Sequence, residues 1–274
     1  MNNFWKRSIT GILYVCVVVG AVLFSQFSFL GLLLVICFFC LSEYVKLFKA
    51  KQVGPPPIAT IFIGLIYFLL REFNTAQIIP AYSINFAQPL LFVVFMVELF
   101  ASKRRSFTAA SIGVAGIIYI SFSLWCFTEV AYLGGNYRPY IILGYFILIW
   151  CSDTMAYVVG NLIGKTKLFK SISPKKTWEG SIGGAVFTIA ASVLLFKFFP
   201  GTLRLFEWVG LAAIIVVFGV IGDLVKSMLK RNSGVKDSGT ILPGHGGVLD
   251  RMDSLLFSAP FAMAFLRLTI VLIP

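Results

Sequence analysis

Seven of the eleven carboxylate side chains lie between residues 153 and 253. Six of these mark where the sequence is best suited to chemistry: Asp153, Glu179, Asp223, Asp237, Asp250 and Asp253. Two of them, Asp153 and Asp223, interrupt long apolar runs. A carboxylate in such a run costs roughly a few kcal/mol unless it is paired, binds a metal ion or faces water. Each could instead be a helix-end residue that reaches the interface, and Asp223 could simply pair with Lys226. We favour a functional role for both.

The segment from Ser227 to Asp253 mixes glycines, basic residues and three aspartates. Glycines let backbone amides approach a polyanion, and Lys and Arg neutralise phosphate charge. Aspartates hold Mg²⁺, which in turn bridges to substrate phosphates. The combination suits phosphoryl or nucleotidyl transfer, although a solvated basic loop is the simpler alternative. His245 is the only histidine and cannot form a zinc site alone, so it is either a substrate contact or a hydrogen-bonding loop residue.

A second polar segment runs from Ser171 to Gly180. Ser173-Pro174 predicts a helix start, with Ser as the cap and Pro in the first turn. Amides at such a helix end, together with Lys175 and Lys176, would bind an anion. The alternative is a juxtamembrane basic stretch anchored at the interface by Trp178.

The composition indicates which elements position these residues. The chain has 274 residues, of which 59% are hydrophobic and only 12% are charged, with a mean hydropathy of +0.93. Soluble domains carry about 25% charged residues. A soluble globule, a disordered chain and a disulfide-stapled module are therefore excluded, and the sequence predicts an all-α polytopic membrane protein. The net charge of +12 indicates the membrane topology and contact with anionic lipid. We expect no nucleic acid as a partner.

About nine transmembrane helices are expected, because each needs about 20 apolar residues. The uncharged stretch between Arg7 and Glu43 fits two short spans with a hairpin at Ser25, Gln26 and Ser28, and a merged element there would reduce the total to eight. The remaining spans fall on residues 52–70, 73–97, 106–128, 139–152, 180–196, 208–222 and 254–274.

Charge placement predicts the orientation. With the N-terminus in the cytoplasm, 18 of the 23 basic residues lie on cytoplasmic segments, as the positive-inside rule requires. The six carboxylates then share that side, so we expect a polar active-site cavity that faces the cytoplasm from the plasma (inner) membrane. Residues 1–105 form transmembrane hairpins. Residues 106–274 form a catalytic domain with cytoplasmic loops 161–180 and 224–253.

The residues from Ser227 to Asp253 resemble the signature of the phosphatidate cytidylyltransferase (CDP-diacylglycerol synthase) family. That signature reads Ser-x-x-Lys-Arg, four residues, Lys-Asp, then Leu-Pro-x-His-Gly-Gly, an apolar residue and x-Asp-Arg-x-Asp. Every position of it is met over these 27 residues. Two further segments, Ser-Asp-Thr-x-Ala-Tyr and Ser-Pro-Lys-Lys-Thr-Trp-Glu-Gly, resemble a second block of the same family. The resemblance is specific over about 150–253 and weak over 1–105.

The resemblance implies an enzyme that transfers CMP from CTP to phosphatidate and releases pyrophosphate. It also implies Mg²⁺ and, as in at least one described member, a second monovalent cation such as K⁺. The metal carboxylates fall by motif position on Asp223 and Asp250, with Asp153, Asp237 and Asp253 as nearby ligands or orienters. The expected catalytic residues are Lys230, Arg231, Lys236, Asp237, His245 and Arg251. The expected substrate-binding residues are Ser173, Lys175, Lys176, Thr177, Ser227, Gly246 and Gly247.

Two other functions fit parts of the pattern. A CTP-dependent lipid kinase would use similar phosphate chemistry but would need a general base for a neutral hydroxyl, and the complete signature argues against it. A transporter could bind ions at Asp153 and Asp223, but it has little need for the Lys/Gly/Asp segment. The first 105 residues could help to form a homodimer or shape a lipid entry path, and the sequence leaves both open.

The charge split predicts that the loop around Gly135 lies outside the cell. A Gly135→Cys variant, made after replacement of the five native cysteines, should react with a membrane-impermeant maleimide added to whole cells. A cysteine placed at Lys165 should react only after the membrane is opened. Labelling of residue 135 from the cytoplasmic side alone would contradict the predicted topology.

Overall fold

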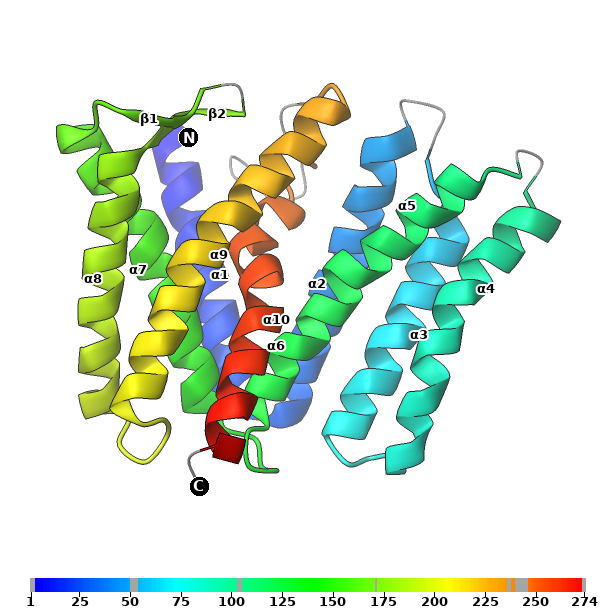
Figure 1. Ribbon diagram of the computed structural model, residues 1–274, viewed down its shortest axis with the longest axis horizontal. Helices are drawn as coiled ribbons and strands as arrows, with labels where there is room; N and C mark the ends of the chain where they lie inside the picture. Colours follow the sequence, from blue (N-terminus) through cyan, green and yellow to red (C-terminus); the bar gives the residue numbers. More distant parts are fainter. Residues whose placement is uncertain are drawn as a thin grey trace. The chain divides into compact units, whose positions relative to one another are not determined.

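The computed structural model describes residues 3–49, 54–102, 105–170, 172–235, 238–239 and 246–272. Over this part the chain is almost entirely helical, with one small β-hairpin (Figure 1). The helices are α1 (Asn3–Phe24), α2 (Gln26–Lys49), α3 (Pro57–Thr75), η1 (Ala81–Phe86), α4 (Ala87–Phe100), α5 (Phe107–Ile117), the π-helical η2 (Ile118–Phe122), α6 (Ser123–Ala131), α7 (Pro139–Ile163), α8 (Trp178–Phe198), α9 (Leu205–Asn232) and α10 (Leu249–Leu272). The strands are β1 (Lys167–Phe169) and β2 (Ser173–Thr177).

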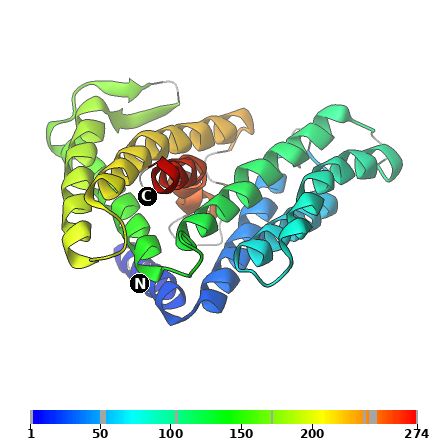
Figure 2. The ribbon, with the colours of Figure 1, turned by 60° about the horizontal axis from the view of Figure 1, so that its bottom comes forward.

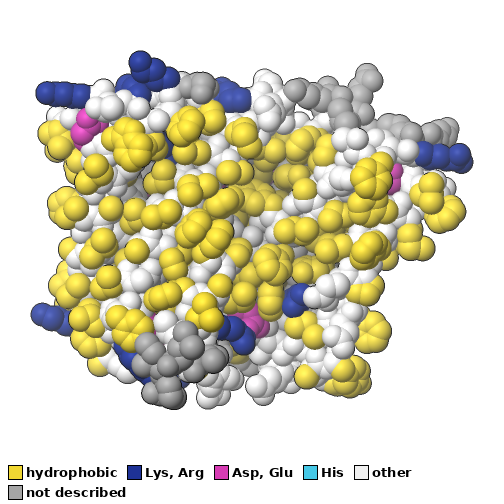
Figure 3. All heavy atoms as spheres, in the orientation of Figure 1, with side chains coloured by type: hydrophobic (Ala, Val, Ile, Leu, Met, Phe, Trp, Pro, Cys, Tyr) yellow, Lys and Arg dark blue, Asp and Glu magenta, His cyan; other side chains and the backbone are white. Residues whose placement is uncertain are grey.

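Among the described residues, eight helical segments are long and apolar enough to cross a membrane. This confirms the prediction of an all-α polytopic membrane protein. Helix α1 adds an apolar stretch, Gly11–Phe24, that is shorter than a full span. Hydrophobic side chains cover most of the visible face of α8 in Figure 3, as expected for a helix against lipid.

The predicted break between the first two helices is present. Helix α1 ends at Phe24 and α2 begins at Gln26. The Ser25 Oγ accepts a hydrogen bond from the Ser28 N–H at 3.1 Å, and the Ser28 Oγ accepts one from the Ser25 N–H at 3.0 Å. This reciprocal pairing satisfies amides that a helix start leaves without partners. Residues 8–42 therefore form parts of two helices rather than one.

The chain divides into two compact units. Unit 1 comprises Met1–Thr128 and Asn232–Met252, and unit 2 comprises Glu129–Arg231 and Asp253–Pro274. In unit 1, helices α3, α4 and α5 pack around a core that includes Ile63, Tyr67, Val94 and Ile117. The segment after α9 thus belongs with the N-terminal helices, although more than 100 residues separate the two parts of unit 1 in sequence.

In unit 2, helices α7 and α8 run side by side (Figures 1 and 2). Small residues allow this close approach. A Cβ atom added at Gly180 would lie 2.6 Å from the Ala156 carbonyl oxygen and 3.0 Å from the Gly160 Cα. Close backbone contact through small residues is the usual way in which helices associate in membranes, where lipid removes the hydrophobic driving force.

The segment before α8 differs from the prediction. Residues Ser173–Thr177 form strand β2, which pairs antiparallel with β1, so the helix start predicted at Ser173-Pro174 is wrong. The cap lies four residues later, where the Thr177 Oγ1 accepts a hydrogen bond from the Gly180 N–H at 3.2 Å. Pairing with β1 holds this segment in an extended conformation, and threonine is one of the favoured N-cap residues.

Candidate functional site

A buried cluster of two aspartates and two lysines lies in unit 2. The Lys226 Nζ lies 2.9 Å from the Asp223 Oδ1 and also contacts the Asp253 Oδ2. The Lys176 Nζ lies 2.7 Å from the Asp223 Oδ2. Lys226 and Asp253 are only 6% and 7% exposed, whereas Asp223 and Lys176 are partly exposed. We call these four residues the Asp–Lys cluster.

Helix packing assembles the Asp–Lys cluster. Asp223 and Lys226 are three residues apart on α9 and therefore share one side of that helix. Gly222 lets α10 come close, because a Cβ there would lie 2.6 Å from the Asp253 carbonyl oxygen. The approach of α10 brings Asp253 to Lys226.

Strand β2 contributes one of the two consecutive lysines. Successive side chains of a strand point to opposite faces. Lys176 is half-buried and reaches Asp223, whereas Lys175 is exposed. The exposed edge of the cluster therefore carries a lysine that is oriented by a carboxylate.

A second polar cluster lies in unit 1 and consists of Glu43, Ser238 and Asp250. The Glu43 carboxylate is 1% exposed and accepts hydrogen bonds at 3.0 Å from the N–H groups of Val248 and Leu249, at the start of α10. The Ser238 Oγ lies 3.0 Å from the Glu43 Oε2 and 2.9 Å from the Asp250 Oδ2. We call this the Glu43 cluster.

The Glu43 cluster organises Asp250. The Asp250 Oδ2 accepts hydrogen bonds from the backbone N–H groups of Ser238 at 3.0 Å and Gly247 at 3.3 Å. Carboxylates in the first turn of a helix also interact favourably with its dipole. A side chain at Gly247 would collide with the Glu43 carboxylate and the Ser238 hydroxyl, so this position requires glycine.

The structure places the predicted site residues as follows. Lys176, Asp223 and Asp253 come together in the Asp–Lys cluster, and Asp250 and Gly247 meet at the Glu43 cluster. Thr177 is buried as the cap of α8, and Gly246 has a positive φ of 84°. The others are described as exposed or partly exposed: Asp153 on α7, Ser173 and Lys175 on β2, Ser227, Lys230 and Arg231 on α9, and Arg251 on α10. Lys236, Asp237 and His245 lie outside the described residues.

Sequence reasoning missed Lys226 and Glu43 as parts of these clusters. The sequence suggests Lys226 only as a structural partner of Asp223, an alternative to a functional role for that aspartate. The structure shows this ion pair and a second ion pair between Lys226 and Asp253. The three-residue spacing of Asp223 and Lys226 on a helix could have indicated that Lys226 belongs to the cluster. Glu43 had no comparable signal, because its partners lie 195 to 206 residues away.

The carboxylate oxygens of the Asp–Lys cluster are of the ligand type that a hard cation prefers. Within the described residues, no three His, Cys, Asp or Glu side chains form a group that could hold a metal ion. Mg²⁺ at phosphate sites, however, is held by one or two carboxylates together with water and substrate oxygens. Asp223 and Asp253 already converge on one positive group, the Lys226 ammonium, so their oxygens are arranged around positive charge.

Comparisons with known proteins point to one family. Residues 5–269 match the model of the cytidylyltransferase family. A phosphatidate cytidylyltransferase of Staphylococcus aureus (strain COL) is 33% identical over 226 residues, which is 82% of this chain and 85% of that protein. Proteins of the same name from Staphylococcus saprophyticus and Staphylococcus haemolyticus are 32% and 30% identical, over 88% and 93% of this chain and 88% and 95% of theirs.

The Glu43 cluster predicts a long-range effect on the start of α10. Glu43→Ala removes the acceptor of two backbone N–H groups and should lower the free energy of unfolding by about 1–3 kcal/mol. Hydrogen exchange at Val248 and Leu249, measured by mass spectrometry, should become faster. Glu43→Gln keeps one acceptor oxygen and should show a smaller change. Unaltered exchange in Glu43→Ala would show that Glu43 does not hold this helix end.

Proposed function

Because the chain belongs to the cytidylyltransferase family, we propose that it transfers CMP from CTP to phosphatidate, forming CDP-diacylglycerol and pyrophosphate. The observation that carries this proposal is the family match over nearly the whole chain, supported by relatives that are named for this reaction. The apolar helices support a place in the membrane, where the lipid substrate resides.

The reaction needs charge neutralisation more than a base. A phosphate oxygen of phosphatidate attacks the α-phosphorus of CTP, a new P–O bond forms, and the bond to the β-phosphate bridging oxygen breaks. The electron pair leaves with pyrophosphate. The nucleophile is already an anion, so no proton needs to be removed from it. The barrier is largely repulsion between anions, which fixed positive groups relieve.

Lys176 is well placed for this role. Its ammonium is partly exposed and is held by Asp223 through an ion pair. A lysine fixed in this way can meet a phosphate oxygen without first being ordered, which reduces the entropic cost of binding. Lys175, Lys230, Arg231 and Arg251 are the other described basic residues that we assign to the nucleotide and lipid phosphates, and Lys236 is assigned from the motif alone.

We assign Mg²⁺ to four aspartates. Asp223 and Asp253 are supported by their convergence on Lys226, and Asp250 and Asp153 by the motif. When bound, the ion would neutralise charge on the CTP phosphates. The Lys226 ammonium already supplies one positive charge to the two aspartates, and a second, monovalent cation such as K⁺ stays a prediction.

The positive-inside rule supports an active site that faces the cytoplasm, and we assign the protein to the plasma (inner) membrane. That side gives access to soluble CTP. The basic residues assigned to phosphate all lie on segments that the charge pattern assigns to the cytoplasm.

The proposed activity predicts that the protein purified in detergent forms CDP-diacylglycerol from radiolabelled CTP and phosphatidate, with pyrophosphate released in equal amount. Replacing phosphatidate by a polyprenol should abolish consumption of CTP. Phosphorylation of the polyprenol would instead identify a lipid kinase. No use of CTP with either lipid, together with ion flux in vesicles, would identify a transporter.

The metal assignment predicts the effect of removing single carboxylates. Asp223→Asn and Asp250→Asn should each lower CDP-diacylglycerol synthesis by roughly 100-fold or more, because charge stabilisation by a metal is worth several kcal/mol. Mg²⁺ should raise the thermal midpoint of the wild-type protein but not that of the variants, since only a bound ligand stabilises the fold.

Glu179→Gln is the matched control. Glu179 is a partly exposed carboxylate outside both clusters, and glutamine can still accept the hydrogen bond from the Thr166 N–H. This variant should keep both the activity and the Mg²⁺ shift. Near-normal Mg²⁺-dependent synthesis by Asp223→Asn and Asp250→Asn would refute the metal assignment, while leaving the reaction itself established.

A further inference from the structure

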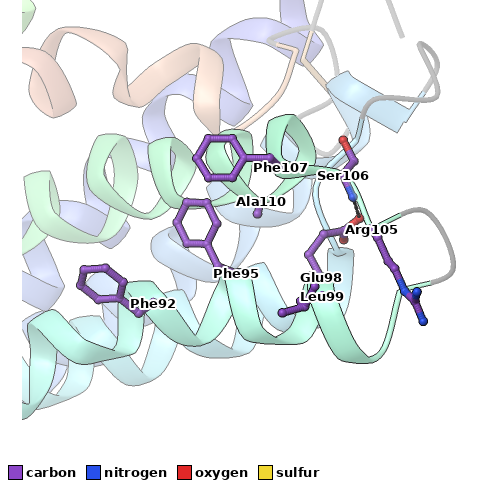
Figure 4. A pocket seen from close by; sticks show the side chains of 8 residues that line it. All are labelled: Phe92, Phe95, Glu98, Leu99, Arg105, Ser106, Phe107 and Ala110. Atoms are coloured by element: carbon purple, nitrogen blue, oxygen red, sulfur yellow. Dashed lines mark hydrogen bonds between the residues drawn. The ribbon is translucent and has the colours of Figure 1, made fainter.

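Unit 1 contains a cavity of about 500 Å³ between α4 and the start of α5 (Figure 4). It has an apolar and a polar end. The apolar end is formed by Phe92, Phe95 and Phe107, and the polar end by Glu98, Arg105 and Ser106. Cavities of about 300–1,000 Å³ with few polar groups typically bind small molecules.

The apolar end is an extended aromatic wall. Phe92 and Phe95 are three residues apart on α4, so they follow one another along one side of that helix. The Phe107 ring, from α5, packs against Phe95 with ring centroids 5.2 Å apart. Phe92 and Phe107 remain exposed, so the wall is open to an acyl chain that lies along α4.

The polar end contains a buried carboxylate with an unused acceptor. Glu98 is 2% exposed, and its Oε1 accepts a hydrogen bond from the Ser106 N–H at 3.1 Å. Within the described residues, its Oε2 has no hydrogen-bond partner. A buried polar atom without a partner is destabilising, so this position favours a ligand that brings a hydrogen-bond donor.

Arg105 lies beyond Glu98. It directly precedes Ser106, its side chain is exposed, and in the described part of the chain it forms no ion pair. Figure 4 shows its guanidinium pointing away from the phenyl rings. The order along the cavity is therefore aromatic wall, buried acceptor, then exposed cation.

We propose that this cavity binds a monoacyl glycerophospholipid. Its acyl chain lies on the phenyl rings, its free glycerol hydroxyl donates to the Glu98 carboxylate, and its phosphate meets the Arg105 guanidinium. A lipid of this class carries the same three groups in the same order. A diacyl lipid such as phosphatidate has an ester in place of that hydroxyl and so lacks the donor that Glu98 requires. The site should therefore distinguish lipids with one chain from lipids with two.

The wild-type protein in nanodiscs tests the role of the hydroxyl. The Kd is measured by displacement of a fluorescent monoacyl lipid, using three competitors with the same acyl chain: 1-acylglycerol 3-phosphate, its analogue without the free hydroxyl, and phosphatidate. The first should bind at least about tenfold more tightly than the other two, because a hydrogen bond to a charged acceptor is worth about 1.5–3 kcal/mol. Equal binding of the hydroxyl-free analogue would overturn the proposal.

Variants test each contact separately. Glu98→Gln keeps an acceptor for the Ser106 N–H, and it should reduce the preference for the hydroxyl to about threefold or less. Arg105→Gln should weaken binding of the phosphate-bearing lipid but not of the neutral monoacylglycerol. An undiminished hydroxyl preference in Glu98→Gln would also overturn the proposal.

The acyl contact has a matched control. Phe92→Ala should weaken binding of the monoacyl lipid, whereas Phe62→Ala, an exposed phenylalanine of α3 outside this cavity, should not. Equal effects of the two variants would place the lipid elsewhere. Glu98→Gln and Phe92→Ala should leave synthesis of CDP-diacylglycerol unchanged, so the outcome is independent of the proposed enzymatic function.

Discussion

The contact of one buried lysine with two aspartates is the interaction on which unit 2 depends. An isolated charge in an apolar helix bundle is too costly to persist, and breaking a buried ion pair leaves an uncompensated charge. The ammonium of Lys226 and the carboxylates of Asp223 and Asp253 therefore stabilise one another. The ends of α9 and α10 that carry them must stay together for this pairing to persist. The same contacts concentrate carboxylate oxygens and a partly exposed lysine, Lys176, where phosphate chemistry needs them.

Small residues make this arrangement possible. Gly222 lets α10 approach α9 closely enough for Asp253 to reach Lys226, and Gly180 lets α8 lie directly against α7. The second contact sets the position of the β-hairpin, because Thr177 both ends β2 and caps α8. Close backbone packing in unit 2 thus determines where Lys176 lies. The Asp–Lys cluster therefore depends on the close packing of the helices around it.

In unit 1 the important interaction is the one that supplies acceptors to the start of α10. The start of α10 exposes backbone N–H groups that need acceptors, and Glu43 of α2 supplies them. This contact ties the N-terminal helices to the segment that carries Asp250. It gives the first 105 residues a role in organising the signature segment, whatever else they do. A mutation near the N-terminus can therefore act on a residue some 200 positions away.

Sequence alone determined the class of fold, the helices and the kind of chemistry. Long uncharged runs can only be stable as helices in lipid, so the spans followed from hydropathy, and Ser25 and Ser28 marked the first break because their hydroxyls cap helix ends. The signature segment indicated phosphate chemistry because its residue types are those that bind phosphate and Mg²⁺. Local patterns misplaced one helix start, since the pairing of β2 with β1 outweighs the preference of Ser173-Pro174. Only the tertiary structure decided that Lys226 joins Asp223 to Asp253 and that Glu43 holds the start of α10. Those contacts depend on which helices pack together, and a charge in a sequence does not specify the distant partner that folding brings to it.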